Sequence, residues 1–306
     1  MNPSVMHRLS KPMLLSAALI WGSSFFMMKN TLDAIPTFYL LAIRFTAGAA
    51  LLALFCLPKW RSQMHLDYLW RGAVMGGFLF LAYSIQTFGL AGTTPSKNAF
   101  LTAVYCVIVP FLNWAVMKQR PDRFNILAAV LCITGVGLVS LTSDFSITWG
   151  DWLTLLCAVF YAAHIIAVAK VSPEKDIYLL TVFQFAFAGL FAWICGFASG
   201  SAFPVTALAS PEVLGSLAYL CVMATTVALL FQNVGQVWSD PASAAVLLSL
   251  ESVFGVLFSV LFYGDPVTFR LVAGFALIFV AVVCSETKFS FLRPASRKRD
   301  HSETVR

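Results

Sequence analysis

Long runs of apolar residues, separated by short polar or proline-containing segments, repeat along most of the chain. A membrane-spanning helix needs about 20 mostly apolar residues, and ten of the runs approach this length. The pattern therefore predicts an all-α, polytopic membrane protein with ten transmembrane helices. We expect them at residues 12–30, 36–57, 70–92, 96–118, 124–142, 150–170, 177–199, 212–238, 242–263 and 267–286. Prolines beside several boundaries support these divisions, because proline lacks a backbone donor.

Composition strengthens this interpretation. Of the 306 residues, 59% are hydrophobic and 11% are charged, whereas a soluble domain has about a quarter of its residues charged. A formal net charge of +6 would suggest nucleic acid as a partner only if it lay on one solvated face, and here the charges are scattered among loops. The seven cysteines lie in apolar runs without a CxxC pair, as buried free thiols do. The first apolar run, Met13 to Met28, is followed by Lys29 and Asn30 and not by a signal-peptide cleavage site.

Basic residues predict the orientation of these helices. With the N-terminus in the cytoplasm, 16 lysines and arginines fall on the inner side and 3 on the outer side, leaving Arg44 inside the second helix. Because cytoplasmic loops carry the excess of basic residues, we expect both termini to be cytoplasmic. We expect the membrane to be a bacterial plasma (inner) membrane. The basic tail is then a topology anchor, with lipid binding or nuclear import as less favoured roles.

An internal repeat divides the chain into two halves. Residues 86–99 (QTFGLAGTTPSKNA) align with residues 232–245 (QNVGQVWSDPASAA) at a constant offset of 146, and LIWGSS of the first helix overlies VFYAAH of the sixth at an offset near 140. We therefore predict a first repeat at 12–142, a second at 150–286 and a cytoplasmic tail at 287–306. Because each half has five helices, an odd number, the halves must be inverted, and inverted repeats enclose a ligand site near the membrane midplane.

Several local patterns resemble the EamA branch of the drug/metabolite transporter superfamily. They are Trp21-Gly22-Ser23-Ser24-Phe25, the pair Arg44-Phe45, a tyrosine and glutamine with a following glycine in the third helix, and Glu251 with Asp265-Pro266. The resemblance extends from about Pro12 to Glu286, and the chain departs from it at Gln119-Arg120 and Ser252. It implies two inverted five-helix repeats, a cavity lined by helices 1, 3, 4, 6, 8 and 9, and movement of small metabolites such as amino acids, amines, sugars or nucleobases, usually without ATP.

Motifs for enzymatic chemistry are missing from the sequence. It contains no Gly-Lys pair for a P-loop, no HExxH and no GxSxG. The four histidines form no cluster with the spacing of metal ligands. We therefore expect no enzyme, no catalytic residue, no metal site and no cofactor.

Glu251 is the strongest candidate for function, because a carboxyl group in the middle of a spanning helix is costly to insert and usually faces the bundle interior or water. It could bind a cationic or amino group or couple transport to protons, and a purely structural role is equally compatible with the sequence. Its repeat equivalent is Tyr105, which shares one helix face with Asn98 and Thr102.

Other polar residues inside spans leave two interpretations open. His164, whose repeat partner is Ser24, could be a ligand or proton relay or a packing residue. Arg44 could bind a carboxylate, although snorkelling or pairing with Glu251 or backbone carbonyls is favoured. Gln86 and Gln232 occupy matched positions and either contact substrate or, as we slightly favour, link helices.

Aromatic residues complete the set of candidates. Trp21, Tyr83, Tyr105 and Tyr161 lie on helices that the resemblance assigns to the cavity, and aromatic walls with few polar groups suit an amphipathic ligand. The candidate substrate-binding residues are Trp21, Ser24, Tyr83, Gln86, Asn98, Thr102, Tyr105, Tyr161, His164, Gln232 and Glu251, with Glu251 and His164 also candidates for proton coupling.

The sequence thus predicts a secondary transporter of a small polar or amphipathic metabolite, working by alternating access, either proton-coupled or facilitative. The partners expected are this substrate and membrane lipids, with no nucleic acid, and a monomer is favoured. The alternative is a non-transporting membrane scaffold or sensor whose basic tail recruits another protein.

Overall fold

The computed structural model describes residues 3–63, 65–140, 148–263 and 267–287. These residues form helices and short connections, without any strand among them. The basic tail, except Thr287, and most of the predicted linker between the halves lie outside the described residues. The helices are α1 (Pro3–Leu32), α2 (Thr37–Gln63), α3 (Asp67–Ala91), α4 (Pro95–Thr102), α5 (Tyr105–Met117), α6 (Arg123–Ser140), α7 (Trp149–Val171), α8 (Ile177–Ala198), η1 (Ala207–Ala209), α9 (Pro211–Tyr219), η2 (Leu220–Val227), α10 (Ala228–Val237), α11 (Pro241–Leu248), α12 (Leu250–Tyr263) and α13 (Phe269–Thr287).

Eight stretches of the described chain are long and apolar enough to cross a membrane. They are Ser4–Leu32, Thr37–Pro58, Asp67–Ala91, Lys97–Met117, Trp149–Val171, Ile177–Ala198, Pro211–Val237 and Pro241–Phe258. Two shorter apolar stretches, Arg123–Gly135 in α6 and Val272–Cys284 in α13, match the fifth and tenth predicted segments. The all-helical membrane architecture is confirmed, whereas a count of ten spans stays a prediction.

Two predicted boundaries differ from the structure. The first helix was expected to start at residue 12 and starts at Pro3, with Pro12 inside it. The second was expected to end at residue 57 and continues through Pro58 to Gln63. Prolines are tolerated within membrane helices because neighbouring groups satisfy the carbonyls that they leave free, so proline is a weaker boundary marker here than in a soluble protein.

Two predicted helices are broken at equivalent positions. Residues 96–118 form α4 and α5, which are separated by Ala103 and Val104, and residues 242–263 form α11 and α12, which are separated by Ser249. The two breaks have similar backbone angles, φ −61° and ψ −11° at Ala103 and φ −62° and ψ −14° at Ser249. With the 146-residue offset, these positions coincide, so both halves bend the same helix at the same place.

The starts of α4 and α11 also match. Thr94 accepts a hydrogen bond from the Lys97 amide at 3.3 Å, and Asp240 accepts one from the Ser243 amide at 3.1 Å. Proline follows each capping residue and occupies the first turn, where its missing donor costs nothing. The equivalent caps explain why the sequence repeat is clearest in this region.

The eighth predicted helix contains a π-helical segment. Residues 220–227 widen the helix between α9 and α10, and the Thr226 hydroxyl donates to the Cys221 carbonyl, five residues back, at 2.8 Å. A π turn frees backbone carbonyls from the regular ladder and often marks a functional site. Here one of these carbonyls, that of Ala224, accepts a hydrogen bond from the Trp21 indole at 2.8 Å.

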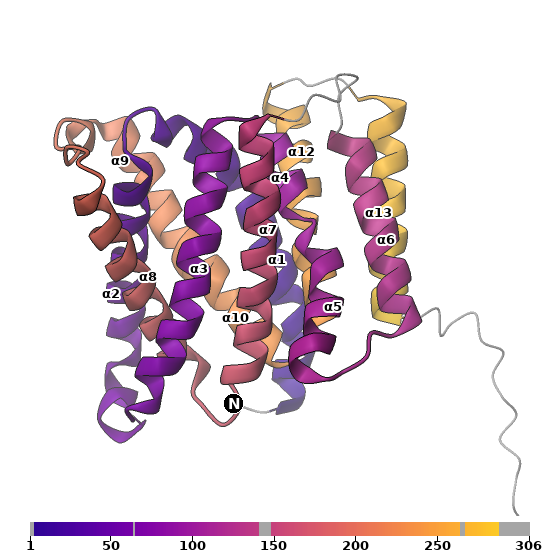
Figure 1. Cartoon of the computed structure of the whole chain (residues 1–306), viewed down its shortest axis with the longest axis horizontal. Helices are drawn as coiled ribbons and strands as arrows, with labels where there is room; N and C mark the ends of the chain where they lie inside the picture. Colours follow the sequence, from indigo (N-terminus) through magenta and orange to yellow (C-terminus); the bar gives the residue numbers. More distant parts are fainter. Residues whose placement is uncertain (1–2, 64, 141–147, 264–266, 288–306) are drawn as a thin grey trace, which may run out of the picture.

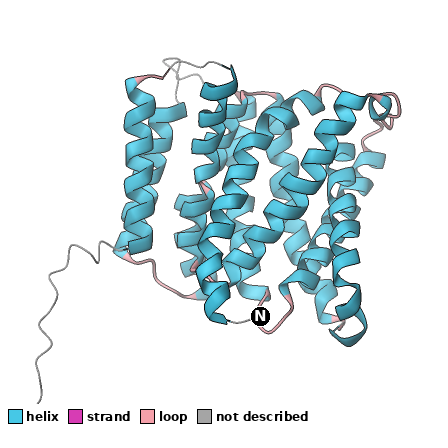
Figure 2. Ribbon diagram, turned by 180° about the vertical axis from the view of Figure 1, so that it is seen from behind, coloured by secondary structure: helices cyan, strands magenta, loops and turns pink. Residues whose placement is uncertain are grey.

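The helices pack as an upright bundle (Figure 1), seen from behind in Figure 2. At one edge α6 lies beside α13, and at the opposite edge α2 lies beside α8. Between these edges α3 packs on α7, and α1 packs on α10 and α12. Helices from the two halves of the chain are therefore interleaved, and the interior lies where the halves meet.

Two glycines allow matching close contacts between the halves. A Cβ at Gly89 of α3 would overlap Thr154 Oγ1 and lie 2.9 Å from the Gly150 carbonyl oxygen of α7. A Cβ at Gly235 of α10 would lie 2.8 Å from Leu14 Cγ and 2.9 Å from the Ser10 carbonyl oxygen of α1. Gly89 and Gly235 are equivalent at the 146-residue offset, and their contacts are related by an offset of 140. Each half thus contributes the same contact to the other.

Candidate functional site

One cavity lies where the two halves meet, and most of the predicted site residues line it. Its lining residues are Trp21, Ser24, Phe25, Met28, Arg44, Tyr83, Gln86, Tyr105, Tyr161, Ile165, Gln232, Leu248 and Glu251. About 460 Å³ inside it is free of protein atoms, but only about 30 Å³ is open to the centre of a water molecule. That is room for about two waters, so side chains nearly fill the cavity.

Arg44 and Glu251 are the two charged residues of the cavity lining. Arg44 is 1% exposed and Glu251 is 5% exposed. Arg44 donates from Nε to Thr225 Oγ1 at 3.0 Å and from a terminal nitrogen to Met28 Sδ at 3.3 Å. The favoured interpretation of Arg44, snorkelling or pairing with Glu251 or backbone carbonyls, is therefore wrong, because the guanidinium is buried and its described partners are a hydroxyl and a thioether.

Glu251 lines the cavity from α12, in the second half of the chain. Its carboxyl group lies beside the Tyr105 hydroxyl, and no basic side chain among the described residues forms an ion pair with it. The cavity thus has one guanidinium and one carboxyl group, each with its own neutral neighbours. A buried ion without a counter-ion is costly, so each is available to a ligand of opposite charge.

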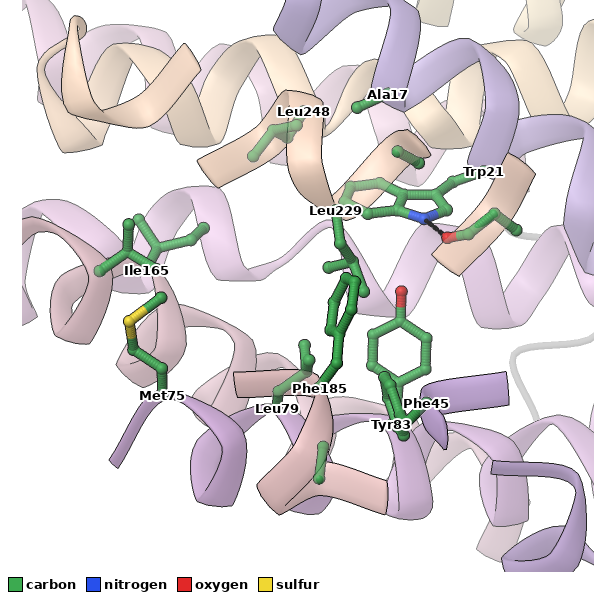
Figure 3. Close-up of a cluster of buried hydrophobic side chains, with 14 of the residues drawn as sticks. Ala17, Trp21, Phe45, Met75, Leu79, Tyr83, Ile165, Phe185, Leu229 and Leu248 are labelled. Carbon is green, nitrogen blue, oxygen red and sulfur yellow. Dashed lines mark hydrogen bonds between the residues drawn. The ribbon is translucent and has the colours of Figure 1, made fainter. Parts of the chain in front are cut away.

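The aromatic residues form a continuous wall. The Tyr161 ring lies 5.6 Å from the Tyr83 ring and 6.2 Å from the Tyr105 ring, measured between centroids. The Arg44 guanidinium lies 5.3 Å from the Tyr83 centroid, in cation–π range. Figure 3 shows Tyr83 beside Phe45, with Trp21 above them and its indole bonded to the backbone. Trp21 and Tyr83, from α1 and α3, therefore border the same interior.

Gln86 lies in the cavity lining and is oriented by a second layer of polar residues. Tyr161 donates to Gln86 Oε1 at 2.7 Å, and Gln86 Nε2 donates to Thr102 Oγ1 at 3.0 Å. Asn98 donates to the Gln86 carbonyl at 3.2 Å and to Thr154 Oγ1 at 2.7 Å. Asn98 and Thr102, predicted as substrate contacts, are thus placed behind Gln86 and are absent from the cavity lining. Gln232, the repeat partner of Gln86, lines the cavity and donates to Gln236 at 3.2 Å.

His164 lies away from the cavity. It is fully buried, and neither ring nitrogen has a hydrogen-bond partner among the described residues. It lies near Gln184 of α8, which accepts a hydrogen bond from Asn233 of α10 at 3.0 Å. The cavity-lining residue of this turn is the adjacent Ile165. The structure therefore separates the two candidates for proton coupling, with Glu251 at the cavity and His164 behind it.

Sequence reasoning did not identify five of the lining residues. Phe25 and Met28 follow Trp21 by four and seven residues, so helical periodicity could have placed them on the same face. Arg44 was identified as unusual but was assigned another role. No sequence signal singles out Ile165 or Leu248 from other apolar residues. Thr225, which holds Arg44, depends on the π segment and has no marker in the sequence.

The described residues offer no group of three or more His, Cys, Asp or Glu side chains that could hold a metal ion. The residues that line the cavity offer hydrogen-bonding groups, two ionisable side chains and aromatic rings. These are the means of binding a small molecule reversibly.

Comparisons with known proteins agree with this geometry. The model of the EamA-like transporter family matches residues 11–141 and again residues 148–287. An uncharacterised transporter of Archaeoglobus fulgidus is 34% identical over 267 residues, which are 87% of this chain and 82% of that protein. A second uncharacterised transporter of the same organism is 26% identical over 252 residues, covering 79% of this chain and 84% of that protein.

Two further similarities are more limited. A UPF0060 membrane protein of Staphylococcus carnosus is 32% identical over 90 residues, 27% of this chain and 82% of its own length. A solved crystal structure shares the fold with a TM-score of 0.75 over 93% of this chain and 99% of that chain, at 17% identity. The family match to both halves and the similarity to the first of these uncharacterised transporters lead to one conclusion. This chain is an integral membrane protein that belongs to the EamA-like transporter family, within the drug/metabolite transporter superfamily.

Proposed function

We propose that this protein is a secondary transporter that carries a small zwitterionic metabolite of the amino-acid type by alternating access. The observation that carries the proposal is that Arg44 and Glu251 line one cavity without pairing with each other. A ligand with a carboxylate and an ammonium group would supply the missing partner to both. An amine alone or a carboxylate alone would leave one buried charge uncompensated, which is costly.

The aromatic wall supports an amphipathic ligand. Tyr83, Tyr105 and Tyr161 offer ring faces and edges to an apolar side chain, while Gln86 and Gln232 offer amide groups. Such a mixture suits the body of an amino acid better than a sugar, which would need more hydroxyl partners. Because side chains nearly fill the cavity, tyrosine or glutamine side chains must move when the ligand binds.

The arrangement of the two halves supports alternating access. Matching helix breaks at Ala103 and Ser249 and matching glycine contacts at Gly89 and Gly235 are what two inverted five-helix repeats would produce. We propose that the chain crosses the membrane ten times, with α6 and α13 among the spans and both termini in the cytoplasm. Related halves that can exchange conformations would open the cavity to each side in turn.

Glu251 is the proposed proton-coupling residue. It lines the cavity beside Tyr105, so a proton and a substrate ammonium group would compete for the same carboxylate. His164 is a weaker candidate because it lies outside the cavity lining. Competition at one site is sufficient to couple the movement of the proton and of the substrate.

A thermal-shift screen of purified protein tests the ligand class. The panel contains L-phenylalanine, phenethylamine and 3-phenylpropionate, which share a ring but differ in charged groups, together with sugars and nucleobases. Because a bound ligand stabilises the folded state, L-phenylalanine or another neutral amino acid should raise Tm the most. Arg44→Gln and Glu251→Gln should abolish this rise. Ser252→Ala, a change in the same helix outside the cavity lining, should keep it. A rise caused only by a sugar, a nucleobase or the amine would contradict the zwitterion proposal.

A further inference from the structure

A second and roomier cavity opens between α3, α5 and α7, apart from the substrate site. It encloses about 940 Å³ free of protein atoms, of which about 460 Å³ is open to the centre of a water molecule. Its walls are mainly apolar, with Val74 and Phe78 from α3, Leu112 and Val116 from α5 and Ile166 from α7. We refer to this cavity as the α3–α5–α7 groove. It shares no lining residue with the substrate cavity.

The polar residues of the groove are gathered at one end. Arg71 lies in the first two turns of α3, and Lys170 lies in the last turn of α7. Trp70, beside Arg71, is 51% exposed, as expected of an aromatic residue at a membrane interface. Phe78 is seven residues beyond Arg71, about 10 Å along the helix. The groove is therefore basic at the interface and apolar toward the membrane interior.

Two basic side chains at this end of the groove have donors or charge that no described residue satisfies. Arg71 donates to the Val171 carbonyl at 2.6 Å and to the Pro173 carbonyl at 3.3 Å, but its Nε is buried without an acceptor among the described residues. Asp67 is 4.0 Å from Arg71 and closer, at 3.2 Å, to Lys175. Lys170 is exposed and has no acidic partner in the described part of the chain. An anionic group at this end would satisfy both Arg71 Nε and Lys170.

We propose that the α3–α5–α7 groove binds an anionic phospholipid, with its phosphate at Arg71 and Lys170 and an acyl chain along Val74, Phe78 and Leu112. Basic pockets between spanning helices recognise acidic headgroups, and the apolar wall explains why the occupant is a lipid and not free phosphate. Because α3 and α5 come from the first half of the chain and α7 from the second, the lipid bridges the two halves.

Native mass spectrometry of the purified full-length chain tests the proposal. The probes are phosphatidylglycerol and phosphatidylcholine with identical acyl chains, and inorganic phosphate. We expect phosphatidylglycerol to bind the wild type in preference to phosphatidylcholine. The double variant Arg71→Gln with Lys170→Gln should lose about tenfold in affinity for phosphatidylglycerol, since hydrogen bonds to charged groups are lost. The matched control, Arg8→Gln with Lys118→Gln, removes the same charge from exposed positions outside the groove and should bind as the wild type.

A second variant tests the acyl chain without changing any charge. Ala163→Phe, at the groove wall, should fill the space and reduce phosphatidylglycerol binding several-fold while the protein stays folded and monodisperse. Equal losses in the Arg71/Lys170 variant and the matched control would overturn the proposal. Unchanged binding to Ala163→Phe, or displacement of the lipid by inorganic phosphate, would also overturn it. No transport is measured, so the result is independent of the proposed transport function.

Discussion

The Tyr105 hydroxyl lies beside the Glu251 carboxyl at the wall of the cavity, although 146 residues separate them. Each residue lies in the first turn after a helix break, Tyr105 at the start of α5 and Glu251 at the start of α12. The same structural position in each half therefore delivers a side chain to the same site. An acidic group on one side and a phenol on the other make this otherwise repeated site asymmetric.

The placement of Glu251 and His164 predicts which residue couples transport to protons. Glu251→Gln should abolish the uptake that a pH gradient drives, because the amide can neither exchange a proton in the cavity nor pair with the substrate ammonium group. His164→Asn should keep this uptake, because His164 lies outside the cavity lining. The measurement is uptake into proteoliposomes with and without an imposed pH gradient. Loss of pH dependence in the His164 variant alone would assign the coupling to His164.

The hydrogen bond from Tyr161 to Gln86 predicts a modest contribution to affinity. Tyr161→Phe removes the donor that holds Gln86 Oε1 at 2.7 Å and should raise the apparent KM by about two- to tenfold, the usual value of a neutral hydrogen bond. Tyr219→Phe is the control, because Tyr219 bonds to Ser23 and does not line the cavity. Equal KM values in the two variants would show that the orientation of Gln86 is unimportant.

The glycine contacts predict similar losses of stability in the two halves. Gly89→Ala and Gly235→Ala should each lower the free energy of unfolding by about 1–3 kcal/mol, because the added methyl group meets backbone or tightly packed atoms. Gly215→Ala should be neutral or slightly stabilising, since a Cβ there has no neighbour within 4 Å. Denaturant titration in detergent micelles measures all three. A loss in one half only would argue against equivalent packing of α3 on α7 and of α10 on α1.

A buried ion pair predicts a larger effect. Lys97 and Asp151 are 2.6 Å apart, and the Asp151 side chain is only 2% exposed. Thr93 also donates to Asp151, at 2.7 Å. Asp151→Asn should lower the free energy of unfolding by about 3–5 kcal/mol, because Lys97 loses its partner in a poorly solvated place. Lys97→Met combined with Asp151→Leu should recover much of this loss. A double variant as unstable as the single one would show that the individual hydrogen bonds, not the charge pairing, stabilise this contact.

The sequence was most informative where the physical signal is local. Apolar runs located the helices because the membrane demands them, and the positions of Pro95 and Pro241 located the starts of α4 and α11. The breaks at Ala103 and Ser249 were not predictable, since neither position carries proline or glycine. The π segment at residues 220–227 likewise has no distinctive composition, and without it the environment of Arg44 could not be foreseen.

For the site, a polar residue within an apolar run indicates an inward-facing side chain but not its depth. Glu251, Gln86 and Tyr105 reach the cavity lining, whereas Asn98 and Thr102 lie behind it. All five have similar sequence surroundings, so only the packing of neighbouring helices distinguishes them.

Counterflow in proteoliposomes tests the central proposal most directly. Vesicles containing purified protein are loaded with an unlabelled neutral amino acid, and entry of the same labelled amino acid is followed over time. The wild type and Ser252→Ala should accumulate label transiently, whereas Arg44→Gln and Glu251→Gln should resemble protein-free vesicles. Accumulation by the two charge variants equal to that of the wild type would contradict the assignment of the Arg44–Glu251 cavity as the transport site.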